Sequence, residues 1–185
     1  MIVTERLLLR PWRDSDREPF FQMNSDPAVM RYFPALLTRQ ESDGLVDRCI
    51  AQWDQRGFTF YAAELRETAD FIGFLGIAAT PFQAPFTPCV EIGWRLAAAY
   101  WNRGLATEGA RAVLRHAFDD LGLPEVVAFT VPANLPSRRV MEKLGMTRNP
   151  ADDFEHPRLP EGHHLRRHVL YRSVRENWPP SVHRP

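Results

Sequence analysis

Residues 91–109 read E-I-G-W-R-L-A-A-A-Y-W-N-R-G-L-A-T-E-G, where a strand pattern passes through a turn of small residues into a helix pattern. From Arg103 to Leu121 the apolar residues recur at helical spacing, which predicts the most regular helix of the chain. Gly122 follows as a C-terminal cap, and Pro124 prevents the helix from continuing. This stretch therefore predicts a strand-to-helix junction at Arg103.

The junction is a candidate phosphate site. A helix start exposes unpaired amides and the positive end of the helix dipole, and both favour an anion. Gly104 leaves the backbone accessible, Arg103 adds a positive charge, Ala106 is small, and Thr107 offers a hydroxyl. A structural alternative is that Gly104 and Ala106 only permit close packing of helix on sheet. The predicted phosphate-binding residues are Asn102, Arg103, Gly104, Leu105, Ala106 and Thr107.

Nucleotide motifs do not explain this junction. Ala110 stands where the phosphate loop of nucleoside triphosphatases requires Lys, which disfavours that chemistry. The glycine fingerprint of dinucleotide folds is absent as well.

The rest of the chain predicts a mixed α/β fold. Helices alternate with strands in the middle, whereas the front contains a hairpin, which favours a mixed sheet over a doubly wound one. We expect one domain over residues 1–178 and a loose, proline-containing tail over residues 179–185. Expected strands cover residues 2–10, 58–65, 71–79, 89–96, 125–131 and 165–174, with another from residue 146, and expected helices surround residues 20–23 and cover 39–55 and 135–144.

Composition excludes several classes of protein. The 185 residues contain 23 basic and 23 acidic side chains, so no global field favours nucleic acid or an anionic membrane. Cys49 and Cys89 lack metal-ligand spacing, which predicts neither a disulfide framework nor a zinc site. The first residues do not form a signal peptide or a membrane span, so we expect a cytoplasmic protein.

Two motifs resemble the GNAT superfamily of N-acetyltransferases, especially its RimJ/RimL-like branch. Trp101 to Ala106, W-N-R-G-L-A, resembles the family's pyrophosphate loop, which has Gln or Arg, two variable residues, Gly, one variable residue and Gly or Ala. Trp departs from the first position but is common there in this branch, as in the pair Tyr100-Trp101. Asn134 to Met146 resembles the branch's N-x-x-S-R-R-V-x-E-K-L-G-hydrophobic signature. With the opening T-E-R-L-L-L-R-P-W and the ending H-V-L-Y-R, the resemblance covers nearly the entire chain.

The resemblance implies a central, mostly antiparallel twisted sheet with a splayed strand pair and flanking helices. It implies transfer of the acetyl group of acetyl-CoA directly to a primary amine, either a protein N-terminus or a small molecule. Trp94, Arg95 and Leu96 would occupy the splayed stretch that pairs with the pantetheine arm. Ser137 would stabilise the departing thiolate through its hydroxyl. Asn134, Arg139 and Lys143 would lie near the pantetheine or the phosphates, although Asn134 and Ser137 are also typical helix-capping residues.

Glu91 is the candidate base. An amine attacks only when unprotonated, so a carboxylate near the reacting centre, acting directly or through water, is a suitable proton acceptor. A charged side chain in an apolar strand needs water, a partner or a raised pKa. The alternative is that Glu91 faces solvent or forms a structural ion pair.

The remaining features leave alternatives open. The four histidines between residues 156 and 168 fit no metal motif, so we predict no metal. Phe82 and Phe86, in a proline-rich loop, line either an acceptor cleft or a homodimer contact. The rival function is a non-catalytic acyl-CoA-binding sensor or interaction module, and a third possibility is unrelated nucleotide binding.

Overall fold

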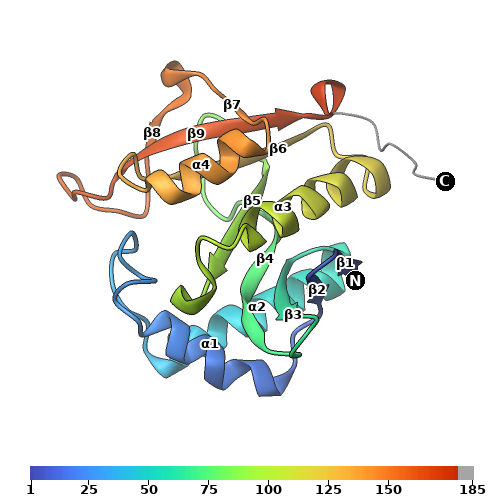
Figure 1. The fold of residues 1–185 in the computed structure, drawn as a ribbon. Coiled ribbons are helices and arrows are strands. Elements are labelled where there is room, and N and C mark those ends of the chain that lie inside the picture. Colours follow the sequence, from blue (N-terminus) through green and yellow to red (C-terminus); the bar gives the residue numbers. More distant parts are fainter. Residues whose placement is uncertain (179–185) are drawn as a thin grey trace.

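A nine-stranded sheet forms the centre of the computed structural model, which describes residues 1–178 (Figure 1). Eight strands follow the order β1-β2-β3-β4-β5-β6-β9-β7, and β8 pairs with β9 beside them. All pairs are antiparallel except that of β5 with β6. The strands are β1 Ile2–Val3, β2 Leu7–Arg10, β3 Phe60–Leu65, β4 Phe71–Ala79, β5 Val90–Leu96, β6 Glu125–Thr130, β7 Thr147–Arg148, β8 Phe154–Glu155 and β9 Arg167–Val174.

Helices cover both faces of the sheet. The α-helices are α1 Arg17–Asn24, α2 Arg39–Arg56, α3 Leu105–Arg115 and α4 Leu135–Lys143. A π-helical turn, His116–Asp120, extends α3, and Gly122 follows with a φ of 65°. The mixed α/β fold predicted from the sequence is confirmed.

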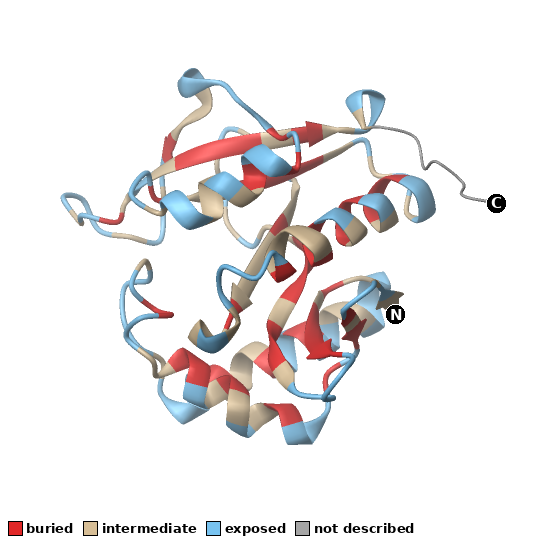
Figure 2. Cartoon of the chain, viewed as in Figure 1, coloured by how far each residue is buried: buried red, intermediate tan, exposed pale blue. Residues whose placement is uncertain are grey.

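Alternation along the strands separates the two faces, because successive side chains of a strand point to opposite sides. Tyr61 and Ala63 of β3 belong to the large core that includes buried residues of α3, whereas Ala62 belongs to a second core with residues of α1 and α2. On β5, Ile92 and Leu96 join the α3 core. The buried positions follow the sheet and the inner sides of the helices (Figure 2).

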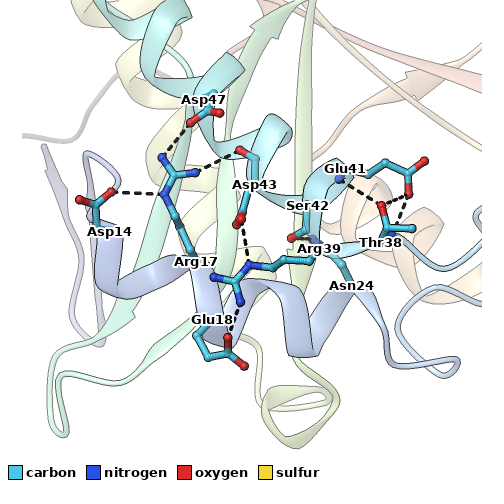
Figure 3. Close-up of polar contacts among 10 residues, drawn as sticks. All are labelled: Asp14, Arg17, Glu18, Asn24, Thr38, Arg39, Glu41, Ser42, Asp43 and Asp47. Carbon is cyan, nitrogen blue, oxygen red and sulfur yellow. Dashed lines mark hydrogen bonds and ion pairs between the residues drawn. The ribbon is translucent and has the colours of Figure 1, made fainter.

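Ion pairs hold α1 against α2 (Figure 3). Arg17 of α1 pairs with Asp47 of α2 at 2.7 Å, and Arg39 of α2 pairs with Glu18 of α1 at 2.5 Å. Helix α2 begins with a capping box, in which the Thr38 side chain accepts from the Glu41 amide and the Glu41 carboxylate accepts from the Thr38 amide. The ion pairs therefore join α1 to α2, and the capping box stabilises the start of α2.

The structure differs from the sequence prediction at three places. The expected single strand over residues 2–10 is a hairpin, because the Thr4 hydroxyl accepts from the Leu7 amide at 2.9 Å and closes a turn. The helical spacing of Leu45, Cys49, Ile50 and Trp53 predicts that all four lie on the inner face of α2, but Ile50 is 37% exposed, while Val46 is fully buried. The short strand β8 was not predicted, since two residues carry no periodicity. The predicted loose tail, residues 179–185, lies outside the described residues.

Strands β5 and β6 splay apart. Strand β5 pairs with β4 along its whole length, from Val90 opposite Ala79 to Leu96 opposite Gly73. Among the described residues, it pairs with β6 at one position, Glu91 opposite Val127. No pair follows this one as β5 continues to Leu96 and β6 to Thr130, so the two parallel strands are splayed toward their C-terminal ends, as the resemblance implies.

Candidate active site

The start of α3 presents open backbone amides. Gly104 is the N-cap residue, with a φ of 79°, and no side chain caps this helix end. The first bond back to the cap comes from the Glu108 amide, which donates to the Gly104 carbonyl at 3.0 Å. The amides of Leu105, Ala106 and Thr107 precede that bond and have no intrahelical acceptor. Three adjacent donors and the helix dipole therefore fit a phosphate group.

Each predicted loop residue has a distinct position in this turn. Asn102, Arg103 and Gly104 are exposed, and Asn102 adopts a φ of 57°. Leu105 is 1% exposed, so its side chain packs into the core and offers no surface to a ligand. Ala106 and Thr107 are partly buried. Open backbone and small side chains thus coincide where the sequence predicts the phosphates.

Arg6 is a residue of this site that the sequence analysis missed. Its Nη1 donates to the Arg103 carbonyl at 2.9 Å, and its Nε donates to the Glu108 carboxylate at 2.6 Å. The Thr4 hydroxyl donates to the same carboxylate at 2.5 Å. Glu108 is thereby held by residues preceding β2 and does not cap its own helix. The T-E-R opening was the available signal, but nothing in the sequence shows that it reaches a helix a hundred residues away.

Trp101 ties the phosphate loop to β5. Its indole Nε1 donates to the Leu96 carbonyl at 2.7 Å, across the turn that joins strand and helix. Arg103 lies over the Tyr100 ring, with its guanidinium carbon 5.6 Å from the ring centroid. The Tyr-Trp pair is therefore a structural part of the loop.

The backbone of β5 offers free groups toward the gap. The Ala97 amide donates to Ile72, and the Cys89 carbonyl accepts from Thr80, so odd-numbered residues of β5 bond toward β4. Trp94 and Leu96 consequently face β6 with their backbone groups, and the Leu96 carbonyl is already used by Trp101. Arg95 faces β4 with its backbone, and its side chain contacts Asn24 and Phe33 on the α1 side of the sheet.

On α4, Asn134 and Ser137 form a linked pair. The Asn134 Oδ1 accepts from the Ser137 amide at 3.3 Å, and the Asn134 Nδ2 donates to the Ser137 hydroxyl at 3.1 Å. Asn134 therefore caps the helix, as the structural alternative predicted. Because the Ser137 oxygen accepts that bond, its own hydrogen is free to be donated elsewhere.

The cations of α4 have different surroundings. Arg138 donates to the Pro132 carbonyl at 3.1 Å and to the Tyr171 hydroxyl at 3.3 Å, so it has a structural role. Arg139 and Lys143 are exposed. These two cations are free to meet an anionic ligand or solvent.

Glu91 lies where β5 and β6 begin to separate. Its side chain is partly buried, and within residues 1–178 its carboxylate receives no hydrogen bond and forms no ion pair. Burial raises the pKa of Glu91 to about 7, against the opposing effect of the positive charge of Arg158. A carboxylate with this pKa is balanced between its two protonation states at neutral pH, as a general base requires.

The proline-rich loop closes over an aromatic cluster near Glu91. Phe82 and Phe86 pack on Phe129 of β6 and Phe154 of β8, with centroid separations of 4.7 to 6.2 Å. Arg158 donates to the Pro81 carbonyl at 2.6 Å, which holds the loop beside the segment that follows β8.

His156 and His168 pack against this aromatic cluster, with ring centroids 4.6 Å from Phe82 and 5.5 Å from Phe154, respectively. Burial lowers the pKa of His156 to about 4, and the charges of His168 and Arg158 act in the same direction.

Within residues 1–178, no group of three or more His, Cys, Asp or Glu side chains is arranged to hold a metal ion. In the same range, no helix has the length and apolar character needed to cross a membrane.

A pocket of about 340 Å³ lies beyond the C-terminal end of β6, between the α1–α2 loop and the segment that leads into β9. Val131 to Ala133, directly after β6, form one wall, and Arg31 and Tyr32 of the α1–α2 loop face them. His164, Leu165 and Arg167 complete the lining. In Figure 1 the loop after α1 rises toward the loop that precedes β9, at the left of the molecule.

Comparison with known proteins agrees with this architecture. The model of the acetyltransferase (GNAT) domain matches residues 6–147. FsC-acetyl coenzyme A-N(2)-transacetylase of Aspergillus fumigatus is 31% identical over 188 residues, covering 95% of this chain and 76% of that protein. The crystal structure of a GNAT-family acetyltransferase from Bacillus anthracis superposes with a TM-score of 0.77 at 28% identity, covering 95% of this chain and 98% of that one.

The fold is also that of a RimL protein. The structure of RimL, a ribosomal L7/L12 alpha-N-protein acetyltransferase in complex with coenzyme A, has a TM-score of 0.73 at 18% identity. It covers 93% of this chain and 96% of that one.

The splayed strands, the uncapped start of α3 and these matches define the class of the protein, the acetyl-CoA-dependent N-acetyltransferases. Within that class, the chain belongs to the GNAT family.

Proposed function

We propose that this enzyme acetylates a primary amine by direct transfer, with Glu91 as the base and Ser137 as the group that assists the departing thiolate. The position of Glu91 is the main support, since it is a carboxylate with a pKa of about 7 and without a partner among residues 1–178, at the start of the strand splay. Acetyl-CoA, when bound, supplies the acetyl thioester.

The start of α3 and the edge of β5 would hold the donor. The amides of Leu105, Ala106 and Thr107 bind the diphosphate, and Arg103 adds positive charge. The backbone of Trp94 and the Leu96 amide hydrogen-bond to the pantetheine arm, with Asn134, Arg139 and Lys143 along the other side. A backbone amide of β5 facing the gap stabilises the oxyanion of the tetrahedral intermediate.

The transfer needs no covalent enzyme intermediate. The amine nitrogen attacks the thioester carbon, a carbon–nitrogen bond forms, and the carbon–sulfur bond breaks. Glu91 takes the proton that the amine nitrogen loses, directly or through water. The thiolate receives a hydrogen bond from the Ser137 hydroxyl, whose hydrogen is not needed for the Asn134 contact. Cys49 has no part in this step, because burial raises the pKa of its thiol to about 11.

The acceptor would approach from the face covered by α1. Glu91, Gly93 and Arg95 share this face of β5, since alternate side chains point the same way. Gly93 has no side chain of its own there, and the Phe60 ring packs against it. The pocket lined by Val131 to Ala133 lies beyond the end of β6. A protein N-terminus and a small molecule are both compatible with an opening of this kind. The homodimer and the cytoplasmic location expected from the sequence stay predictions.

Thiol release from acetyl-CoA across a panel of amines and N-terminal peptides tests the proposed function. We expect turnover with at least one acceptor and its near loss in Glu91→Gln. Binding of acetyl-CoA with no turnover on any acceptor would instead favour the sensor or interaction module. Thermal stabilisation by adenosine triphosphate but not by coenzyme A would favour unrelated nucleotide binding.

A further inference from the structure

The pocket beyond the strand splay is positively charged. Arg31 and Arg167 line it together with His164, and none of its eight lining residues is an Asp or a Glu. Arg31 contacts the Tyr32 ring at 5.4 Å and has no ion pair among the described residues. Arg167 has a carboxylate partner, Glu155, at the long distance of 3.6 Å. The pocket therefore has more positive charge than the chain itself neutralises.

A third cation, Arg95, lies beneath the loop that carries Arg31. Its guanidinium carbon is 4.0 Å from the centroid of Phe33 and 5.4 Å from that of Phe74. Its Nη1 donates to the Asn24 Oδ1 at 2.6 Å, but its Nε is buried without a partner. No carboxylate among residues 1–178 pairs with it, and burial lowers its pKa to about 10. An uncompensated buried charge is costly, and a nearby anion reduces that cost.

Asn24 and its neighbours hold this cation in place. The Asn24 Nδ2 donates to the Ser42 hydroxyl of α2 at 2.9 Å, and both residues are completely buried. Figure 3 shows Asn24 and Ser42 together at the contact of α1 with α2. Because the amide is fixed from α2, its oxygen stays directed toward Arg95. The packing of α1 against α2 therefore fixes the position of the Arg95 charge.

We propose that the acceptor is a small molecule in which the primary amine is accompanied by an anionic group, such as a carboxylate, and that Arg31 and Arg167 bind this group. The inference rests on the proposed function. The amine lies toward Glu91, and the anionic group occupies the pocket at Val131 to Ala133. Val127 and Val131 are four residues apart, which corresponds to about 13 Å along an extended chain, so the acceptor is elongated. Arg95 strengthens the positive potential from beneath.

The test compares triglycine with triglycine amide, which have the same amine and nearly the same shape but differ in the terminal charge. Binding to the complex with coenzyme A is measured by calorimetry, and kcat/KM is measured by thiol release. We expect triglycine to exceed its amide at least tenfold in both. Arg31→Gln and Arg167→Gln are each expected to reduce the triglycine values about tenfold, the equivalent of about 1.4 kcal/mol, and the amide values less than twofold.

Arg56→Gln is the matched control, because Arg56 is an exposed arginine at the end of α2 outside the pocket lining. It should leave both ligands unchanged. Equal binding of triglycine and its amide, or an equal loss of both in the two pocket variants, would overturn the proposal. Preference for a long N-terminal peptide with an amidated end would overturn it as well. A charge preference in binding that the pocket variants abolish, without turnover of any amine by the wild type, would support the anion pocket and refute the proposed transfer.

Discussion

Glu91 lies opposite Val127 at the position where β5 and β6 pair before they part. The pairing places a carboxylate at the closed end of a gap whose open end leads to the phosphate loop on one strand and to α4 on the other. Strand β4 secures β5 along its full length, so the gap opens on one side only. The proposed base and the proposed cofactor site therefore lie along a single strand and the helix that follows it.

Replacing Glu91 tests its role as base. Glu91→Gln should lower kcat about 10² to 10⁴-fold, the usual contribution of general base catalysis, and leave the affinity for acetyl-CoA within about twofold. The variant should fold, because Gln removes a partly buried charge and keeps the shape. Steady-state kinetics and calorimetry provide the two readouts. Equal losses of turnover and cofactor affinity would remove the proposed role.

The pH profile provides a second test of the same carboxylate. If Glu91 is the base, the free enzyme is active when this carboxylate is ionised, and burial raises its pKa to about 7. The acidic limb of kcat/KM should therefore have its midpoint near pH 7, with activity falling as the pH falls below that value. Protonation of the acceptor amine also lowers the rate below the pKa of that amine. The limb that belongs to Glu91 is therefore the one whose midpoint stays the same for acceptor amines of different pKa. A midpoint near pH 4.5 would mean that Glu91 is an ordinary exposed carboxylate.

Ser137 and Asn134 separate thiolate stabilisation from helix capping. Ser137→Ala keeps the amide that Asn134 caps, so the variant should lose about tenfold in kcat and little stability. Asn134→Ala removes the cap and should cost about 1 kcal/mol of unfolding free energy. Kinetics and urea unfolding of both variants check this division. Unchanged kcat in a folded Ser137→Ala would exclude its part in the leaving-group step.

A side chain at Gly104 should obstruct the phosphate site. Gly104→Glu places a negative charge at the amides of α3 and should weaken coenzyme A binding at least a hundredfold. Gly57→Glu is the matched control, because Gly57 also has a positive φ, 73°, and ends α2 away from the site. Both variants suffer the same backbone strain, so a selective loss of coenzyme A affinity identifies the phosphate loop. Equal affinities in the two folded variants would count against it.

Arg10 joins two buried carboxylates and should be essential for stability. It pairs with Asp16 and Glu64 at 2.7 Å each, and its residue exposure is 3%. Arg10→Met leaves both carboxylates without this partner and should cost about 3 to 5 kcal/mol. Arg13→Met is the control: the Arg13 side chain is 58% exposed, it contacts the same Glu64 at 3.2 Å, and its loss should cost less than about 1 kcal/mol. Similar midpoints of urea unfolding for both variants would contradict this account.

Local patterns predicted the parts of this molecule that depend on periodicity and end signals. A helix beginning near Arg103, a helix over residues 39–55 and strands over residues 58–65 and 71–79 were expected from such signals, and the structure has them as α3, α2, β3 and β4. The two motifs that resemble the family lie at the junction of β5 with α3 and on α4, the helix after β6. The GNAT fold with its splayed strands followed from that resemblance.

Long-range contacts could not be predicted in this way. Arg6 reaches Glu108 and the Arg103 carbonyl, and Arg95 lies under Phe33, because the sheet brings distant segments together. The residues of the candidate site were predicted by type and position. Which strand the backbone of each β5 residue faces, however, depends on whether the residue is odd- or even-numbered. Only the β4–β5 register shows that the Arg95 backbone pairs with β4, whereas the Trp94 backbone faces the gap.

A crystal structure of the enzyme with acetyl-CoA would test the donor site and the position of Glu91 together. We expect a diphosphate on the amides of Leu105, Ala106 and Thr107, a pantetheine arm between β5 and β6, and a thioester within reach of Glu91 through at most one water. A structure in which the Arg6 or Glu108 side chain fills the start of α3, while the cofactor binds elsewhere, would contradict this expectation.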